Sequence, residues 1–136
     1  LAAGPAAKIT NNVYRKKALK ALEKRNATLG NESEYLNMLC NMNVGDNVSV
    51  SGNMTEANLF NYIADYCQME MMVAKRNMTL GNVSTTIEEK LKNPPAPNAS
   101  HMTKVSFIRG IEAECAKDMA KVGMGKAKSW FDEKTK

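Results

Sequence analysis

Seven asparagines of this chain stand in the tripeptide Asn-X-Ser/Thr, whose side-chain amide accepts N-linked sugar. One such sequon is weak evidence, but with 15 Asn and 15 Ser or Thr in 136 residues chance predicts roughly two. The alternative, an Asn-rich cytosolic chain with accidental tripeptides, is disfavoured. We expect an extracellular glycoprotein, secreted or associated with the cell surface, in which each used asparagine lies on the surface. The acceptors are Asn26, Asn31, Asn47, Asn53, Asn77, Asn82 and Asn98.

The residue types that carry catalysis are scarce. His101 is the only histidine, so it would have to serve every Ser/His/Asp or Cys/His arrangement. Zinc needs about four ligands, and the cysteines and the histidine have no short-range pairing. No glycine-rich phosphate loop occurs. The sequence predicts no catalytic residue, no cofactor and no resident metal, and we expect a protein that is not an enzyme.

One cluster of sulfur side chains could bind Cu(I), which prefers soft ligands. On a helix, Met69 and Met72 share a face while Met71 lies elsewhere, so the sulfur atoms do not converge. Methionine also fills gaps in cores and lines adaptable apolar pockets. We interpret the cluster as core, with an apolar pocket or interface and a metal site as the alternatives.

The three cysteines form an odd set. In an oxidising compartment we expect one disulfide and one thiol that is free or intermolecular. Cys67 and Cys115 lie at a similar depth in two predicted helices, so they are the expected pair if those helices run parallel. Cys40 is then left to join two chains or to stay buried as a small apolar side chain. The pair Cys40–Cys67 is the alternative.

Two decapeptides 51 residues apart, KRNATLGNES (24–33) and KRNMTLGNVS (75–84), are identical at eight of ten positions. Repeats of this length bury a shared core by packing on each other. We therefore expect a single helical domain over residues 1–122, with an internal repeat of 24–74 and 75–122. A basic tail follows at 123–136.

Apolar residues at helical spacing predict an all-α fold, a compact up-and-down bundle of about five helices built from two repeats. Gly30 and Gly81 suit the left-handed residue that ends a helix. Thr85 followed by Glu88 resembles a capping box, and prolines 94, 95 and 97 end the helix that it opens. The predicted helices span residues 8–28, 33–42, 55–78, 85–92 and 103–122, with a loop at 43–54.

The third and fifth predicted helices also carry the side chains that would line the bundle interior. Such an interior could hold a small apolar, lipid-like ligand. The candidate lining residues are Leu59, Phe60, Ile63, Met71, Ile108, Ile111 and Met119.

Charge is segregated along the chain, whose net charge is +5. Residues 1–25 carry +6, residues 26–74 carry −6 and residues 75–136 carry +5. The first helix and the tail could thus form a basic face toward anionic partners. Alternatively, the basic first helix packs beside the acidic third helix and the charges offset one another. Nucleic acid is not an expected partner, because no aromatic-rich basic motif is present.

Three functions remain open. The first is a non-enzymatic extracellular glycoprotein that acts by recognition or self-assembly, with an extracellular protein or a second copy as partner, the latter giving a homodimer. The second is a carrier of a lipid-like ligand. The third is a membrane-surface-active basic protein that uses the first helix and the Trp130-Phe131 tail. No apolar run is long enough for a transmembrane segment.

Overall fold

The computed structural model describes residues 5–42 and 56–122, with side chains from Val13 onward in the first helix. These residues form five helices and no strand: α1 (Pro5–Leu29), α2 (Glu34–Cys40), α3 (Glu56–Leu80), α4 (Thr85–Leu91) and α5 (His101–Ala120). The predicted all-α bundle of five helices is confirmed. The predicted loop at 43–54 and the basic tail at 123–136 lie outside the described residues.

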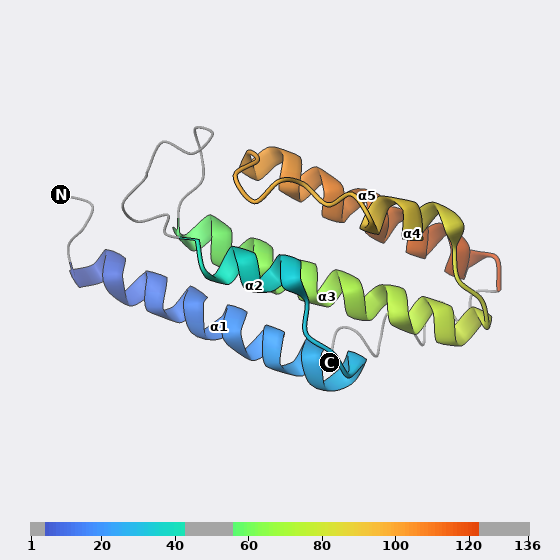
Figure 1. Ribbon diagram of the computed structural model, residues 1–136, viewed down its shortest axis with the longest axis horizontal. Helices are drawn as coiled ribbons and strands as arrows, with labels where there is room; N and C mark the ends of the chain where they lie inside the picture. The colour runs from blue at the N-terminus through green and yellow to red at the C-terminus, as the bar shows by residue number, and fades with distance from the viewer. Residues whose placement is uncertain (1–4, 43–55, 123–136) are drawn as a thin grey trace.

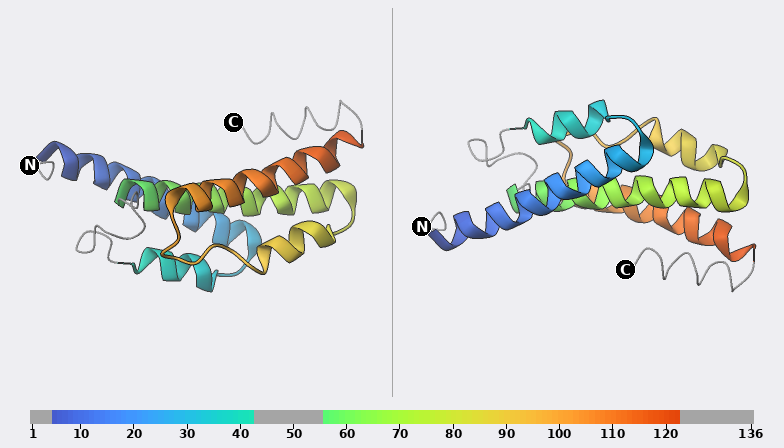
Figure 2. Two further views of the ribbon diagram at one scale, coloured as in Figure 1. Left: turned by 90° about the horizontal axis from the view of Figure 1, so that it is seen from above. Right: turned by 90° about the horizontal axis from the view of Figure 1, so that it is seen from below.

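The three long helices run side by side in the same direction, and the two short helices return the chain between them (Figure 1). α3 lies in the middle and packs against both α1 and α5. Figure 2 shows α2 and α4 on the same side of the three long helices. The chain therefore alternates in direction along the bundle, and the central helix is the one with neighbours on most sides.

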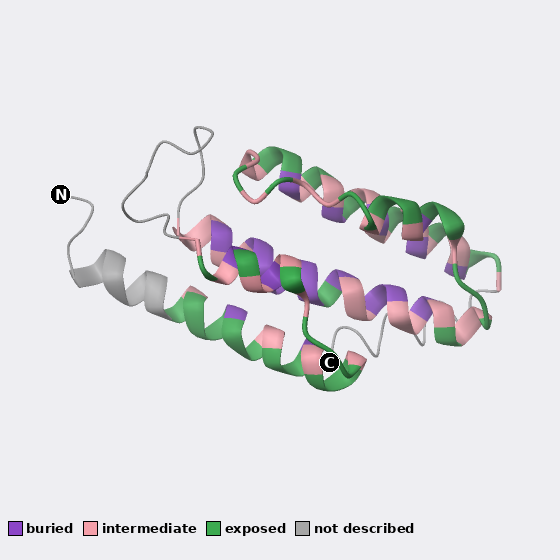
Figure 3. Ribbon diagram, in the orientation of Figure 1, coloured by how far each residue is buried: buried purple, intermediate pink, exposed green. Residues whose placement is uncertain are grey.

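The core follows from this central position of α3. Its buried positions are not confined to one stripe, because α1, α5 and the short helices cover it from several directions (Figure 3). Each aliphatic or aromatic side chain buried in this way stabilises the fold by about 1.5–3 kcal/mol. Fully buried members include Leu36 and Leu39 of α2, Ile63 and Met69 of α3, Ile87 of α4, and Ile111 and Met119 of α5.

Serine and glycine residues set the helix ends. Ser33, Ser84 and Ser100 each accept a hydrogen bond from a backbone N–H three residues later, which caps α2, α4 and α5. The capping residue of α4 is thus Ser84, one residue before the predicted Thr85. Gly30 and Gly81 have φ values of 77° and 73° and end α1 and α3, as predicted.

A group of aromatic and basic side chains ties the proline loop between α4 and α5 to the bundle. The Tyr35 hydroxyl donates to the carbonyl of Pro95 at 2.7 Å, so Tyr62 must donate in the 2.8 Å bond that joins the two hydroxyls. Lys104 is fully buried, donates to the carbonyl of Pro97 and lies over the Tyr62 ring. Desolvation lowers the pKa of Lys104 to about 8. Hydrogen bonds to the backbone carbonyls of Pro95 and Pro97 therefore hold this loop against the bundle.

Candidate functional site

The two related decapeptides form two similar polar networks, each centred on a buried arginine. We call them the first clasp (Arg25, Asn26, Asn31, Ser33 and Glu70) and the second clasp (Arg76, Asn77, Asn82, Ser84 and Asp118). In each, the arginine lies in the last turns of a long helix and reaches a carboxylate on the next long helix. Four of the seven sequons belong to these two networks.

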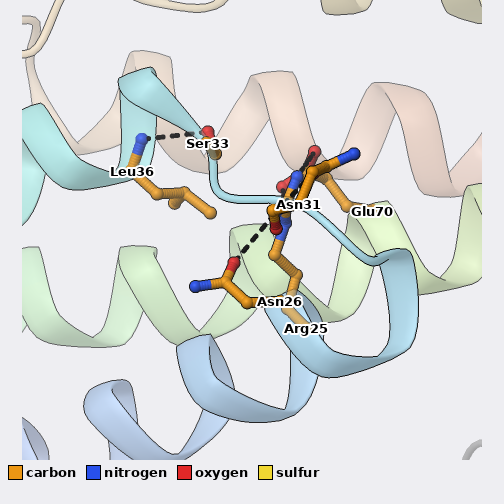
Figure 4. A network of polar contacts seen from close by, with 6 residues as sticks. All are labelled: Arg25, Asn26, Asn31, Ser33, Leu36 and Glu70. Carbon is orange, nitrogen blue, oxygen red and sulfur yellow. Dashed lines mark hydrogen bonds and ion pairs between the residues drawn. The ribbon is translucent and has the colours of Figure 1, made fainter.

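In the first clasp all three guanidinium nitrogens of Arg25 donate hydrogen bonds (Figure 4). Arg25 donates from Nε and Nη2 to the two carboxylate oxygens of Glu70 at 2.9 and 3.1 Å. Its Nη1 donates to Asn26 Oδ1 at 2.8 Å, and to the backbone carbonyl and Oδ1 of Asn31 at 2.7 and 3.1 Å. A guanidinium that is only 4% exposed is thus paired and hydrogen-bonded, which offsets its desolvation.

The second clasp repeats the local contacts with a weaker ion pair. Arg76 Nη1 donates to Asn77 Oδ1 at 2.9 Å and to the backbone carbonyl of Asn82 at 2.6 Å. Its Nε donates to one oxygen of Asp118 at 3.0 Å. The other oxygen of Asp118 lies 3.9 Å from the ammonium of Lys121. The similar geometry extends over the two decapeptides. Duplication of the longer segments, residues 24–74 and 75–122, stays a prediction.

The order of residues within the decapeptide explains this geometry. The arginine and the following asparagine lie near the end of the long helix, and the glycine after it adopts a left-handed conformation that turns the chain. This turn brings the second asparagine back toward the arginine, so that its carbonyl can accept, and the serine then caps the short helix. Five of the eight residues that the two copies share therefore have a structural role.

The described sequons fall into two structural groups. Asn26 and Asn77 are half-buried within the last turn of a long helix. Asn31, Asn82 and Asn98 are exposed in the turns that precede α2, α4 and α5. The serines of these three sequons are the helix caps, so their residue type has a structural reason besides sugar attachment. Asn47 and Asn53 lie outside the described residues.

The expected Cys67–Cys115 disulfide is not formed, and Cys40, Cys67 and Cys115 are free thiols. Arg76 lies nine residues after Cys67, whereas its partner Asp118 lies three residues after Cys115. A register set by this ion pair favours an offset between the two cysteines along their parallel helices, whereas a disulfide needs Cα atoms within about 7 Å. The Cys67–Cys115 pair stays a prediction.

The surroundings of the thiols disfavour the thiolate form. Burial raises the pKa of Cys67 to about 12 and that of Cys115 to about 11, with smaller contributions from neighbouring charges. Burial also raises the pKa of the half-buried Cys40, which Arg15 opposes. Cys40 and Cys67 are likewise free in this structure, so the alternative pair Cys40–Cys67 also stays a prediction.

A small pocket of about 240 Å³ lies where α1, the end of α2 and the start of α3 meet. Three of the seven predicted lining residues, Leu59, Phe60 and Ile63, line it. Ile108, Ile111 and Met119 are instead buried in the core, and Met71 is half-buried outside this pocket. The remaining lining residues are Arg15, Ala18, Leu19, Cys40, Met42 and Glu56.

The methionine cluster belongs mainly to the core. Met69 and Met72 are buried, whereas Met78 is exposed near the end of α3. Within residues 5–42 and 56–122, no group of three or more His, Cys, Asp or Glu side chains could hold a metal ion. His101 opens α5, and its Nδ1 is buried without a hydrogen-bond partner in the described structure.

The exposed surface of α1 is basic. Lys16, Lys17, Lys20 and Lys24 are exposed, and in the described part of the chain none of them lies in an ion pair with a carboxylate. α1 does pack beside α3, as one of the two interpretations expects, but Arg25 is the basic residue that pairs across this contact. Most of the positive charge of α1 therefore remains on the surface.

Comparison with known proteins finds no family model, no curated protein and no solved structure that matches this chain. Among the described residues, no helix has the length and apolar character needed to cross a membrane.

Proposed function

We propose that this chain is an N-glycosylated extracellular protein, secreted or held at the cell surface, that acts without catalysis by recognition or self-assembly. The observation that carries the proposal is the number of sequons, seven where chance predicts roughly two. The exposure of Asn31, Asn82 and Asn98 in turns supports it, because attached sugar needs a solvated surface.

The exposed lysines of α1 are the contact surface that we propose for recognition. Lys16, Lys20 and Lys24 are spaced four residues apart and Lys17 adjoins them, so the four share one helix face. Val13, which is largely exposed, continues this face toward the start of α1. A partner with an acidic surface, another extracellular protein or a second copy of this chain, would complement it and associate faster at low salt.

The test of the glycoprotein proposal is intact-mass measurement on protein from its natural source, before and after enzymatic removal of N-linked sugar. A loss of carbohydrate mass on treatment is the expected result, and an unchanged mass contradicts the proposal. The same measurement without reduction detects chains that are joined through a cysteine.

Replacement of Lys16, Lys17, Lys20 and Lys24 by glutamine tests the contact surface. We expect the variant to lose self-association or partner binding, measured by analytical ultracentrifugation. The unfolding transition should stay unchanged because these side chains are exposed and lie in no ion pair within the described residues. Association that survives in the folded variant would exclude this surface.

A carrier of an apolar ligand is the second candidate, favoured by the pocket that Leu59, Phe60 and Ile63 line. Its volume of about 240 Å³ lies below the roughly 300–1,000 Å³ of typical ligand sites. A short apolar chain is therefore the largest ligand that we expect it to enclose. Organic extraction of native protein followed by mass spectrometry should release such a compound, and an empty extract excludes this candidate.

Membrane-surface activity stays a prediction from the sequence, because the Trp130-Phe131 tail lies outside the described residues. Binding to anionic vesicles should fall when residues 123–136 are removed and the lysines of α1 are neutralised. Unaltered binding would contradict it.

A further inference from the structure

The half-buried sequon asparagines and the exposed ones differ in the contacts that an attached sugar would disturb. We infer that, among the described sequons, N-linked sugar is carried by Asn31, Asn82 and Asn98, and that Asn26 and Asn77 stay bare. This inference rests on the proposed function, since it assumes that the chain meets the transferase.

The side chains of Asn26 and Asn77 take part in the two clasps. Each presents its side-chain carbonyl to the neighbouring arginine, at 2.8 Å from Arg25 and 2.9 Å from Arg76. Sugar is attached to the amide nitrogen of the same planar group. The hydrogen bond to the arginine and the attached sugar therefore both constrain the orientation of that group. Figure 4 shows the oxygen of Asn26 directed at Arg25 and its nitrogen directed away from it.

A sugar that turned the Asn77 amide away would leave Arg76 Nη1 with one acceptor for its two N–H groups. By contrast, Arg25 Nη1 would lose Asn26 and keep the two oxygens of Asn31. Loss of an acceptor from a buried polar group costs about 1–3 kcal/mol. Both asparagines are also half-buried, which leaves little room for a solvated sugar beside the helix. Chains that carry sugar at these two positions are therefore expected to fold less well and to be depleted from mature protein.

Asn31 and Asn82 contribute to the same clasps mainly through the backbone. Their carbonyl oxygens accept from the arginines at 2.7 and 2.6 Å. The side chain of Asn31 adds a longer contact of 3.1 Å, and no side-chain bond joins Asn82 to Arg76 in the described structure. A sugar at either position leaves the backbone contact intact, and both residues are exposed.

Asn98 lies in the turn before α5, outside both clasps, and is exposed. The turn after α3 lies at one end of the bundle, the turn before α5 lies toward the other end, and the turn after α1 lies beside the middle of α3 (Figure 1). Sugars at Asn82 and Asn98 would therefore lie toward opposite ends, and a sugar at Asn31 would lie beside the last turns of α1. Lys16, Lys17 and Lys20, which lie earlier in α1, would remain accessible to a partner.

The test uses two matched sets of variants of the full chain, expressed in cells that N-glycosylate secreted proteins. Asn26→Asp and Asn77→Asp remove a sequon but keep an oxygen acceptor for the arginine. Ser33→Asp, Ser84→Asp and Ser100→Asp remove a sequon but keep a good helix cap, because aspartate caps as well as serine. The readouts are intact mass and the occupancy of each sequon by glycopeptide mapping.

We expect the two asparagine variants to keep the full carbohydrate mass and each serine variant to lose one glycan. Sugar mapped to Asn26 or Asn77 in the secreted wild type overturns the inference, as does a bare Asn31, Asn82 or Asn98. Sugar found only at Asn47 or Asn53 overturns the inference and leaves the proposed function standing. Sugar at no sequon overturns both.

Discussion

The two clasps share eight of ten residues in their decapeptides and differ in the ion pair that each arginine makes. Arg25 binds both oxygens of Glu70, whereas Arg76 binds one oxygen of Asp118, whose other oxygen faces Lys121. The glutamate is longer by one methylene, which lets its carboxylate meet the guanidinium edge to edge. The decapeptide thus sets the conformation of the arginine side chain. The carboxylate outside it, Glu70 or Asp118, determines the strength of the ion pair between consecutive long helices.

The largest expected effect comes from removing each arginine. Arg25→Met leaves Glu70 without its partner in a mostly buried site, and removal of one member of a buried pair costs about 3–5 kcal/mol. Arg76→Met should cost less, about 2–3 kcal/mol, because fewer charged hydrogen bonds are lost and Lys121 remains near Asp118. Urea unfolding of the two variants measures this, and equal or reversed losses contradict the difference between the clasps.

Thiol labelling should show where each variant opens. Cys67 lies within the electrostatic influence of Arg25 and Glu70, and Cys115 within that of Arg76 and Asp118. We therefore expect Arg25→Met to speed labelling of Cys67 more than that of Cys115, and Arg76→Met to do the reverse. Equal acceleration of both thiols in both variants would show that the halves open together.

The same thiols give a pH dependence of stability. Their folded pKa values, about 12 for Cys67 and about 11 for Cys115, exceed the ordinary value of 9.0. Between these values the unfolded chain releases protons that the folded chain keeps, so stability is fully present below pH 9.0 and falls as the pH rises above it. Unfolding of Cys67→Ala and Cys115→Ala, compared from neutral to alkaline pH, should show a smaller loss, with Cys67 the larger contributor.

The two glycines should behave alike, in contrast to the arginines. Gly30 and Gly81 have nearly the same positive φ, and an added Cβ would meet no atom within 4 Å at either position. The cost of Gly→Ala is then that of the left-handed backbone alone, about 1 kcal/mol at each site. Thermal unfolding of the two variants checks this, and clearly unequal losses would mean that the turns differ in more than their ion pairs.

The smallest expected effect would make the second clasp resemble the first. Asp118→Glu supplies the longer carboxylate, which can reach a second donor of Arg76. We expect a gain of a few tenths to about 1 kcal/mol in unfolding free energy, together with a larger loss on subsequent removal of Arg76. A loss of stability in Asp118→Glu would show that the space between α3 and α5 does not admit the longer side chain.

Helix positions could be predicted from the sequence because Gly30, Gly81 and the proline loop mark the ends of helices whose apolar residues recur at helical spacing. α5 begins two residues before the predicted start, since Ser100 was interpreted as part of a sugar acceptor and not as a cap. A serine immediately before the first residue of an apolar helical pattern is the signal that could have identified the cap of α5.

The clasps and the cysteine register could not be predicted in the same way. Arg25 and Glu70 are 45 residues apart, and nothing in local spacing identifies one as the partner of the other. The register of Cys67 against Cys115 depends on how the side chains of α3 and α5 interlock. Likewise, the predicted pocket grouped residues by helix face, whereas the pocket that Leu59, Phe60 and Ile63 line lies at one end of α3 and has no α5 residue in its lining.

The buried arginines join consecutive long helices through ion pairs. A double-mutant cycle with Arg25→Met and Glu70→Leu, run beside one with Arg76→Met and Asp118→Leu, measures both ties directly by urea unfolding. We predict a coupling of about 1.5–3 kcal/mol for the first pair and a smaller coupling for the second. A coupling below about 0.5 kcal/mol in the first cycle would contradict the claim.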